Sequence, residues 1–283
     1  MDPIKTDAIV LRVVEFSETS CIVTLFSRTL GKISTIAKGA RRKKSPFEAA
    51  LDLIAICRIV FLHKSSQSLD ILTEAKLQRR FRSSAKDLDR FYAGLYLIEL
   101  LNLMTDDADP HEELFDEAVA AIERIDTADL DDDSEGDDSG SSGNARASTK
   151  HALINFEIRL LDLLGHLPML THCVDCGRPK TTISRVQFGL NRGGIICQNC
   201  RPGKTNVISL SSEGLELLLK MTKSKTNQDK NRDCDLREQF GENLIDVSNQ
   251  PGYGEVRQLI SKYITHLIGH PPRLHQYLGN LSN

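Results

Sequence analysis

Residues 7–27 read DAIVLRVVEFSETSCIVTLFS, and this stretch decides the fold of the N-terminal part of the chain. It contains two short runs rich in Ile, Val, Leu and Thr, Asp7–Val14 and Ser20–Ser27, which are separated by the polar break Glu15–Thr19. Runs of this composition bounded by polar residues are typical of β-strands. The chain is therefore predicted to begin with two consecutive strands.

Three more runs of the same kind follow before residue 80. They are Lys32–Lys38 after the Leu30-Gly31 turn, Leu51–Leu62 after the basic break Ala40–Pro46, and Leu69–Lys76 after a Ser/Gln turn. Five strands within about seventy residues favour a small closed barrel, because closure removes exposed strand edges. An OB-fold is the natural five-stranded candidate and an SH3-like barrel is its main competitor, because periodicity cannot separate the two.

After residue 80 the apolar residues recur every three to four positions, which is the spacing of one helical face. Leu88–Leu101 shows this spacing, and Asp109-Pro110 is predicted to begin a second helix with Asp109 as the N-cap. The second half of the chain is expected to be helical apart from Cys173–Cys200. Its other helical segments are Phe156–Leu164, ended by Gly165, and Val256–Leu267, ended by Gly269.

Two Cys-x-x-Cys pairs, Cys173-Val-Asp-Cys176 and Cys197-Gln-Asn-Cys200, are separated by twenty residues. This spacing is typical of a zinc ribbon, in which four thiolates surround one tetrahedral Zn²⁺. A hairpin through Val186–Leu190 would return the second pair to the first. Four cysteine ligands leave no open position for water, so the ion is predicted to be structural. Two redox pairs or four unrelated thiols are the alternative.

Composition places the chain among ordinary globular proteins. It has 283 residues, of which 40% are hydrophobic, 27% are charged and none is Trp. No apolar stretch is long enough for a membrane span, and the N-terminus does not resemble a secretory signal, so a cytoplasmic protein is expected. Cys21 and Cys57 lie in apolar strand runs and are predicted to be buried, whereas Cys234 lies in a polar stretch.

An acidic segment interrupts the helical part of the chain. Residues 126–138 contain eight acidic side chains and no basic one. Such a composition cannot bury enough apolar surface to offset its ordering entropy. We expect residues 126–149 to form a disordered linker or loop.

Positive charge is concentrated in two N-terminal segments. Residues 28–44 contain seven Lys or Arg side chains and no acidic one, and a second cluster extends from Lys76 to Arg90. Dense positive charge favours phosphate backbones, because each neutralised phosphate releases counterions. A solubilising surface is the alternative. The predicted nucleic-acid contacts are Lys32, Lys38, Arg41, Arg42, Lys43, Lys44, Arg79 and Arg80.

Aromatic residues suited to base stacking are few in this region. The candidates are Phe16, Phe26 and Phe47, and all three are expected to lie in the core. Recognition is therefore predicted to rest on the nucleic-acid backbone, with little readout of sequence. The chain also lacks a phosphate loop, a G-x-S-x-G elbow, an H-E-x-x-H helix and a dinucleotide fingerprint, so no enzymatic activity is predicted.

Together these parts closely resemble the RecO family of bacterial DNA repair and recombination mediators. The resemblance rests on KGARRKKS at residues 38–45, on NFEIRLLDLLGH at residues 155–166, and on the cysteine pairs that follow. Residues 259–278 are similar to the C-terminal helix and Leu-Gly tail of the family. The chain departs from the family in its longer acidic insertion and in the PPRLH sequence at residues 271–275.

The resemblance implies an α+β protein with an OB-fold nucleic-acid-binding domain at residues 1–80 and a helical domain at residues 81–283. The helical domain would carry the acidic insertion at about 126–150 and the zinc module at about 170–204. The implied DNA contacts are Lys38, Arg41, Arg42, Lys43 and Lys44, and the implied zinc ligands are Cys173, Cys176, Cys197 and Cys200.

The resemblance also implies a function. Proteins of this family bind single- and double-stranded DNA, anneal complementary strands and help to load recombinase on DNA coated by single-strand-binding protein. The implied partners are RecR and the acidic C-terminal tail of single-strand-binding protein, and the implied location is the cytoplasm, at the nucleoid. A zinc-ribbon and OB-barrel adaptor that acts on RNA or in transcription is the alternative.

Overall fold

The computed structural model describes residues 3–42, 45, 47, 50–63, 69–83, 87–127, 141–180, 185–223 and 247–279. The chain forms two compact units. The first comprises Met1–Asp133 and Pro272–Leu278, and the second comprises Ser134–Pro271 and Gly279–Asn283. Within the described ranges, no helix combines the length and the apolar character needed to cross a membrane.

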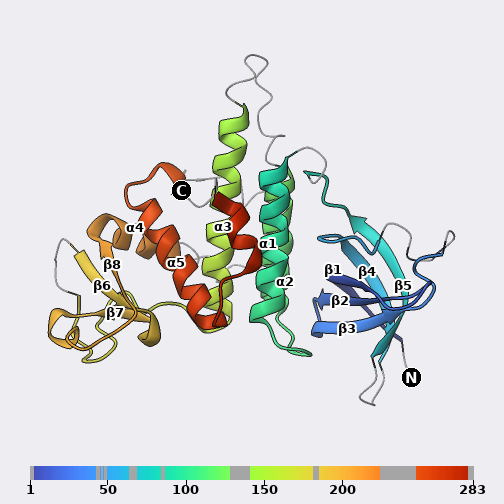
Figure 1. Ribbon diagram of the computed structural model, residues 1–283, viewed down its shortest axis with the longest axis horizontal. Coiled ribbons are helices and arrows are strands. Elements are labelled where there is room, and N and C mark those ends of the chain that lie inside the picture. Colours follow the sequence, from blue (N-terminus) through green and yellow to red (C-terminus); the bar gives the residue numbers. More distant parts are fainter. Residues whose placement is uncertain are drawn as a thin grey trace, which may run out of the picture. The chain divides into compact units, whose positions relative to one another are not determined.

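The first unit begins with a closed five-stranded barrel (Figure 1). The order of the strands around it is β1-β2-β3-β5-β4, and β1 closes the barrel by pairing with β2 on one side and β4 on the other. This arrangement confirms the α+β prediction with an N-terminal OB-fold. The strands are β1 Pro3–Glu15, β2 Cys21–Ser27, β3 Gly31–Ala37, β4 Ile56–Leu62 and β5 Asp70–Arg79.

The alternation of buried and partly exposed residues that is typical of a strand is regular in β3. In β3, every second residue from Gly31 to Ala37 is buried, as expected for a strand with one face in a core. The β1 strand is longer and bends at a bulge between Val10 and Arg12, which lets it pair with two neighbours. Cys21 and Cys57 lie in the barrel core, as predicted.

In the described part of the first unit, the barrel is followed by two helices, α1 Leu88–Met104 and α2 Glu112–Thr127. The N-cap of α1 is Asp87, whose carboxylate accepts hydrogen bonds from the backbone N–H groups of Asp89 and Arg90 at 2.9 and 3.2 Å. The predicted start of α2 was wrong by a few residues. Asp109 is not the cap of that helix, and its carboxylate contacts the ring of His111 at 2.9 Å instead.

Gly31 is the first residue of β3 and follows the turn from β2. At this point the barrel lies against the segment that precedes α2. The φ of Gly31 is +68°, and a Cβ atom at this position would overlap the backbone carbonyl of Asp109. We expect Gly31→Ala to lower the free energy of unfolding by about 2 kcal/mol or more, because backbone strain and collision add. Urea denaturation followed by circular dichroism measures the loss.

A matched control separates the two causes of this loss. Gly165 has a φ of +74° and no atom within 4 Å of the added Cβ position, so Gly165→Ala introduces strain without collision. We expect its loss of stability to be clearly smaller than that of Gly31→Ala. If both variants lose the same free energy of unfolding, the collision with Asp109 contributes nothing to the effect of Gly31→Ala.

The C-terminal segment η5 Arg273–Leu278 belongs to the first unit and packs on α1. The carboxylate of Glu99 on α1 accepts the backbone N–H groups of Arg273 and Leu274 at 2.8 and 2.9 Å. The ring of Tyr277 stacks on that of Tyr92 with centroids 4.8 Å apart. The first unit is therefore completed by residues from the far end of the chain.

In its described residues, the second unit combines three helices with a three-stranded antiparallel sheet of order β7-β6-β8. The helices pack through apolar faces that include Phe156, Leu160, Leu218 and Ile260, all of them buried. The elements are α3 Ser141–Leu163, β6 Arg185–Gly189, η2 Leu190–Arg192, β7 Gly194–Ile196, η3 Gln198–Cys200, β8 Val207–Ser211, α4 Ser212–Lys223, η4 Val247–Asn249 and α5 Tyr253–Ile268.

The structure differs from two expectations in the second half of the chain. The sequence was expected to be helical after Cys200, yet β8 forms there because it pairs along its length with β6. The predicted linker at 126–149 is helical at both ends, since α2 continues to Thr127 and α3 begins at Ser141. Residues 128–140 and Cys234 lie outside the described part of the chain.

Candidate nucleic-acid interface and metal centre

The candidate nucleic-acid surface is built around a tight turn after β3, which we call the basic turn, Lys38–Arg42. Gly39 has a φ of +74°, and the N–H of Arg42 donates to its carbonyl at 3.1 Å. The N–H of Arg41 donates to the carbonyl of Thr19 at 3.1 Å, which ties the turn to the loop between β1 and β2. The side chains of Lys38, Arg41 and Arg42 are exposed.

Arg41 also makes side-chain contacts with that loop. Its guanidinium lies 3.0 Å from the carboxylate of Glu15 and donates to the carbonyl of Ser17 at 3.3 Å. Both partners of the ion pair are solvent-exposed, at 41% and 74%, and exposed pairs contribute about 0–1 kcal/mol. A phosphate group can therefore replace Glu15 as the partner of Arg41 at little cost.

Lys32 has a different environment from the rest of the predicted set. Its ammonium group donates to the backbone carbonyls of Asn102 and Thr105 at 3.0 and 2.6 Å and lies 3.6 Å from the carboxylate of Asp107. These carbonyls lie at the C-terminal end of α1, where they need donors and where positive charge is favoured. The Lys32 side chain is only 14% exposed, so it joins β3 to α1 and presents little charge to solvent.

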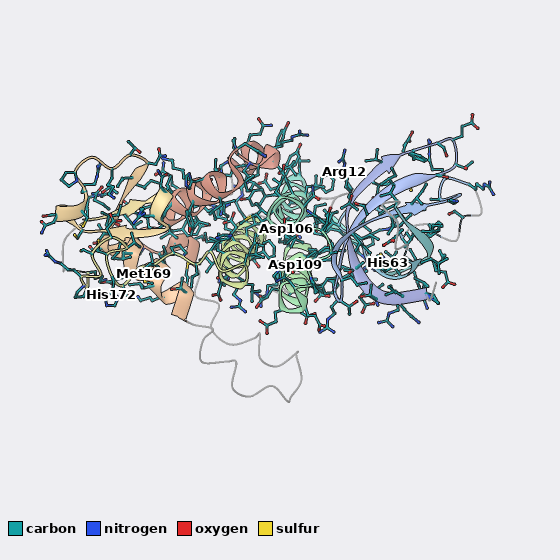
Figure 2. All side chains as sticks on the ribbon, turned by 90° about the horizontal axis from the view of Figure 1, so that it is seen from below. Arg12, His63, Asp106, Asp109, Met169 and His172 are labelled. Atoms are coloured by element: carbon teal, nitrogen blue, oxygen red, sulfur yellow. The ribbon has the colours of Figure 1, made fainter. Side chains whose placement is uncertain are left out.

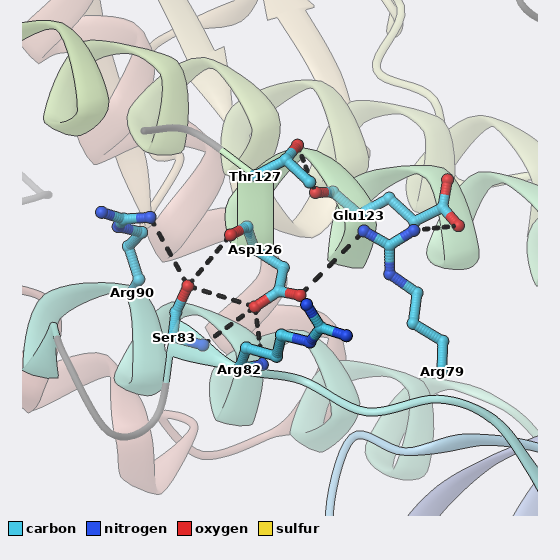
Figure 3. A network of polar contacts seen from close by, with 7 residues as sticks. All are labelled: Arg79, Arg82, Ser83, Arg90, Glu123, Asp126 and Thr127. Carbon is cyan, nitrogen blue, oxygen red and sulfur yellow. Dashed lines mark hydrogen bonds and ion pairs between the residues drawn. The ribbon is translucent and has the colours of Figure 1, made fainter. Parts of the chain in front are cut away.

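The two predicted arginines at the end of β5 also differ from each other. Arg79 lies 2.8 Å from the carboxylate of Glu123 and 4.0 Å from that of Asp126, within the network drawn in Figure 3. Asp126 in turn accepts the backbone N–H and the hydroxyl of Ser83, so the network attaches the segment before α1 to α2. Arg80 is exposed to solvent. Lys43 and Lys44 lie outside the described residues.

The three candidate aromatic residues do not share one environment. Phe26 and Phe47 are buried, as expected, with exposed fractions of 0% and 4%. The prediction for Phe16 was wrong, because its side chain is 61% exposed in the loop between β1 and β2. The apolar type of the residue suggested the core, and only its place in the polar break Glu15–Thr19 could have indicated otherwise.

The four cysteines of the Cys-x-x-Cys pairs converge in the second unit. Figure 2 labels Met169 and His172, which come shortly before Cys173 in the chain. Their sulfur atoms all lie within 4.8 Å of one another, and those of Cys176 and Cys197 are 3.7 Å apart. Zn–S bonds of about 2.3 Å in a tetrahedron require sulfur atoms about 3.8 Å apart. The cluster therefore fits a tetrahedral metal ion. Its members are Cys173, Cys176, Cys197 and Cys200.

Local structure explains this convergence. The hairpin formed by β6 and β7 returns the second pair to the first, as predicted, and Gly177 with a φ of +70° ends the first turn. Met169 donates to Gly193 at 2.9 Å and Val174 donates to Ile195 at 3.0 Å, so backbone hydrogen bonds fasten the first pair to the hairpin. In the described residues, His172 is not among the clustered ligands, and its ring contacts Thr171.

The electrostatics of the cluster favour a bound cation. Burial opposes ionisation of Cys173, but the backbone N–H groups of Cys197, Cys176 and Asp175 outweigh it and lower the pKa of this thiol to about 6. The pKa of Cys200 is raised to about 12, chiefly by hydrogen bonding with Cys197 and also by burial. Cys173 thus readily forms the thiolate that binds a metal ion, and a bound cation would favour the same form of Cys200.

Asp175 holds the two halves of the cysteine module together. Its carboxylate lies 2.7 Å from the guanidinium of Arg192 in the hairpin and 3.0 Å from the ammonium of Lys204 beyond the second pair. The hydrogen bond from Lys204 is the largest cause of the lowered pKa of Asp175, and Arg192 adds to it against burial. Sequence analysis missed this residue, although its position between two cysteine ligands was a signal.

Comparisons with known proteins give matches along nearly the whole chain. The family model described as recombination protein O, N terminal, matches residues 1–81, and the corresponding C-terminal model matches residues 85–136 and 143–275. A DNA repair protein RecO from Rhodopirellula baltica is 37% identical over 280 residues, which cover 96% of this chain and 97% of that protein. A DNA repair protein RecO from Anaeromyxobacter sp. is 27% identical, over 99% of this chain and 98% of that protein.

Proposed function

Since this chain belongs to the RecO family of DNA repair proteins, we propose that it binds single- and double-stranded DNA by the phosphate backbone and anneals complementary strands. We further propose that it helps to load recombinase on DNA coated by single-strand-binding protein. The observation that carries this proposal is the exposed basic turn on a closed OB barrel.

The contacts of the individual side chains refine the proposed interface. Lys38, Arg42 and Arg80 are exposed, and Arg41 has a weak solvent-exposed partner, so we propose these four as phosphate contacts. Lys43 and Lys44 continue the same basic run in the sequence, and we keep them as proposed phosphate contacts. Lys32 and Arg79 are given a structural role, because their charges already face carbonyl and carboxylate groups.

The proposed activity needs no bond chemistry. Two complementary strands repel each other as polyanions, and a basic surface that holds one strand lowers this repulsion for the second. Contacts to phosphates leave the Watson–Crick edges free to pair. We therefore propose an annealing and loading protein without enzymatic activity.

Partners and location follow from the proposed role. We propose that RecR and the C-terminal tail of single-strand-binding protein bind this chain, and that it acts in the cytoplasm at the nucleoid. We also propose Zn²⁺ as the ion of the four-cysteine cluster, where it would stabilise the fold of the second unit. No specific observation favours the alternative of an adaptor that acts on RNA or in transcription.

Affinity measured against salt tests the basic turn directly. The double variant Lys38→Ala/Arg42→Ala removes two proposed phosphate contacts. We expect the slope of log affinity against log salt on single-stranded DNA to become shallower by about 1.4, which is about 0.7 for each contact. Strand annealing of complementary oligonucleotides should slow in parallel, because less charge is then available to screen the strands.

The matched control is Lys220→Ala/Lys262→Ala, which removes the same charge from exposed positions on α4 and α5. We expect its slope and annealing rate to equal those of the wild type. An unchanged slope for the Lys38/Arg42 variant would exclude the basic turn from the binding surface. Equal affinity for RNA and DNA strands would leave the RNA alternative open, whereas preference for RNA would favour it.

A further inference from the structure

The cysteine module of the second unit carries more positive charge than its own contacts use. This module, residues 173–204, contains six Lys or Arg side chains and one acidic side chain, Asp175. Asp175 is already paired with two of the cations, and Arg185 lies 2.9 Å from the carboxylate of Glu255 on α5. Four thiolates around the proposed Zn²⁺ would contribute two net negative charges, which still leaves an excess of positive charge.

Two of the six cations have no carboxylate partner. Arg178 and Lys180 follow the first cysteine pair, and both side chains are exposed. Within the part of the chain that the structure describes, no carboxylate lies within 4 Å of either charged group. Their backbone is nevertheless fixed, because Cys173 donates to the carbonyl of Arg178 at 2.8 Å and Lys180 donates to that of Thr171 at 2.9 Å. These two charges are therefore available to an anionic ligand.

Both cations line a pocket beside the sulfur cluster. The pocket has a volume of about 260 Å³ and also borders Cys173 and Cys197. Pockets for drug-sized ligands have volumes of about 300–1,000 Å³, so this one is suited to a smaller group, of the size of a single nucleotide. None of the described residues that line it is acidic. Its electrostatics therefore favour an anion.

The rest of the lining combines an apolar wall with polar side chains. Val186, Ile195 and Ile196 line the pocket and are buried, whereas Gln198 and Asn199 line it and are exposed. Amide side chains bind phosphate and sugar oxygens in protein–DNA complexes, as Arg and Lys do. A nucleotide has both these oxygens and a flat base that can lie against an apolar wall. The lining is therefore complementary to a nucleotide.

We propose that this pocket binds one nucleotide of a DNA strand and forms a second DNA-binding surface, separate from the basic turn. Arg178 and Lys180 hold the phosphate of that nucleotide. The amides of Gln198 and Asn199 donate to phosphate and sugar oxygens, and the apolar wall contacts the base. The inference rests on the proposed function and adds a surface to it. A run of acidic residues in a peptide offers the same charge but no ring for the apolar wall.

Two surfaces allow one chain to hold two strands at once. The basic turn belongs to the first unit and the pocket to the second. Each strand then meets its own cations, so neither surface has to neutralise the phosphates of both strands. This division is suited to annealing, in which two polyanions must be bound before they pair.

The number of short strands bound per chain tests the proposal. We expect the wild type at low salt to bind about two molecules of oligo-dT of about eight nucleotides, one at each surface, as measured by titration calorimetry. Arg178→Ala/Lys180→Ala should bind about one, because it loses the phosphate contacts of the pocket. One strand per chain in the wild type, or two in this variant, would overturn the proposal.

The matched control is again Lys220→Ala/Lys262→Ala, which removes the same charge elsewhere in the second unit and should bind as many strands as the wild type. Hydrogen exchange of the β6 and β7 amides should be the same in Arg178→Ala/Lys180→Ala as in the wild type, since only exposed side-chain atoms are lost. This measurement shows whether the variant keeps its fold.

An uncharged variant tests the polar lining independently. Gln198→Ala/Asn199→Ala removes two proposed hydrogen-bond donors and no charge. We expect the second binding step to weaken by about tenfold, with an unchanged dependence on salt. Unchanged affinity in both binding steps would exclude the two amides from the contact.

The outcomes separate this inference from the proposed function. If the wild type binds no DNA at low salt, the proposed function fails. If it binds DNA and Arg178→Ala/Lys180→Ala binds the same number of strands with the same affinity, only the second surface fails. An oligo-glutamate peptide that binds the wild type but not this variant, while DNA binds both equally, would assign the pocket to acidic peptides and overturn the inference.

Discussion

Replacement of Cys176 by Ser will remove the ion that we propose for the four-cysteine cluster, so that metal content should fall from about one equivalent per chain to nearly none. Cys176 is the exposed member of the four-cysteine cluster, so the substitution removes a ligand without creating a cavity in the core. Structural zinc sites contribute about 10–16 kcal/mol of apparent binding free energy, and this energy is largely folding energy. Loss of the metal should therefore unfold the cysteine module.

Metal analysis and hydrogen exchange measure the two parts of this result. We expect the amides of β6 and β7 to lose protection in Cys176→Ser, while those of the barrel strands keep it. The control is Cys21→Ala, which removes a thiol from the barrel core and should leave the metal content unchanged. Retention of a full equivalent of metal by Cys176→Ser would contradict assignment of Cys176 as a ligand.

Replacement of Arg257 by Leu will destabilise the second unit by about 3–5 kcal/mol. The guanidinium of Arg257 on α5 forms an ion pair with the carboxylate of Glu157 on α3, and the two side chains are only 2% and 0% exposed. The variant leaves the Glu157 carboxylate in the core without this cation. The side chain is buried away from water, so loss of the Arg257 cation makes its charge more costly in the folded state.

A double-mutant cycle separates the ion pair from general packing. Because Glu157→Leu/Arg257→Leu removes both charges, we expect it to be more stable than either single variant. Urea denaturation of the four proteins, followed by helical circular dichroism, gives the coupling energy. A loss below about 1 kcal/mol for Arg257→Leu, or strictly additive losses in the cycle, would show that the pair contributes little.

Local patterns in the sequence were sufficient to predict much of the fold. The runs Asp7–Val14 and Ser20–Ser27 could be predicted as strands from their content of Ile, Val, Leu and Thr, and each buries most of its apolar side chains. Gly165 and Gly269 end helices with positive φ, as their positions indicated. The cysteine spacing identified the ligand cluster, because four thiols separated in this way have few other uses.

The features that the sequence did not predict depend on partners distant in the chain. Lys32 appears in the sequence as one more cation, and only the end of α1 gives it a structural role. Asp126 begins an acidic run, yet it accepts hydrogen bonds from Ser83 in a segment more than forty residues earlier. The β8 strand needs β6 as its neighbour, so short-range periodicity could not identify it.

The attachment of η5 to α1 has a consequence for synthesis of the protein. Glu99 receives its backbone hydrogen bonds, and Tyr92 its stacked ring, from residues that follow Pro272. A ribosome that adds about 5–20 residues per second needs roughly 7 to 28 s to pass from Asp133 to this segment. The barrel can close early during translation, but the unit that contains it reaches its final packing only after Pro272–Leu278 has been synthesised.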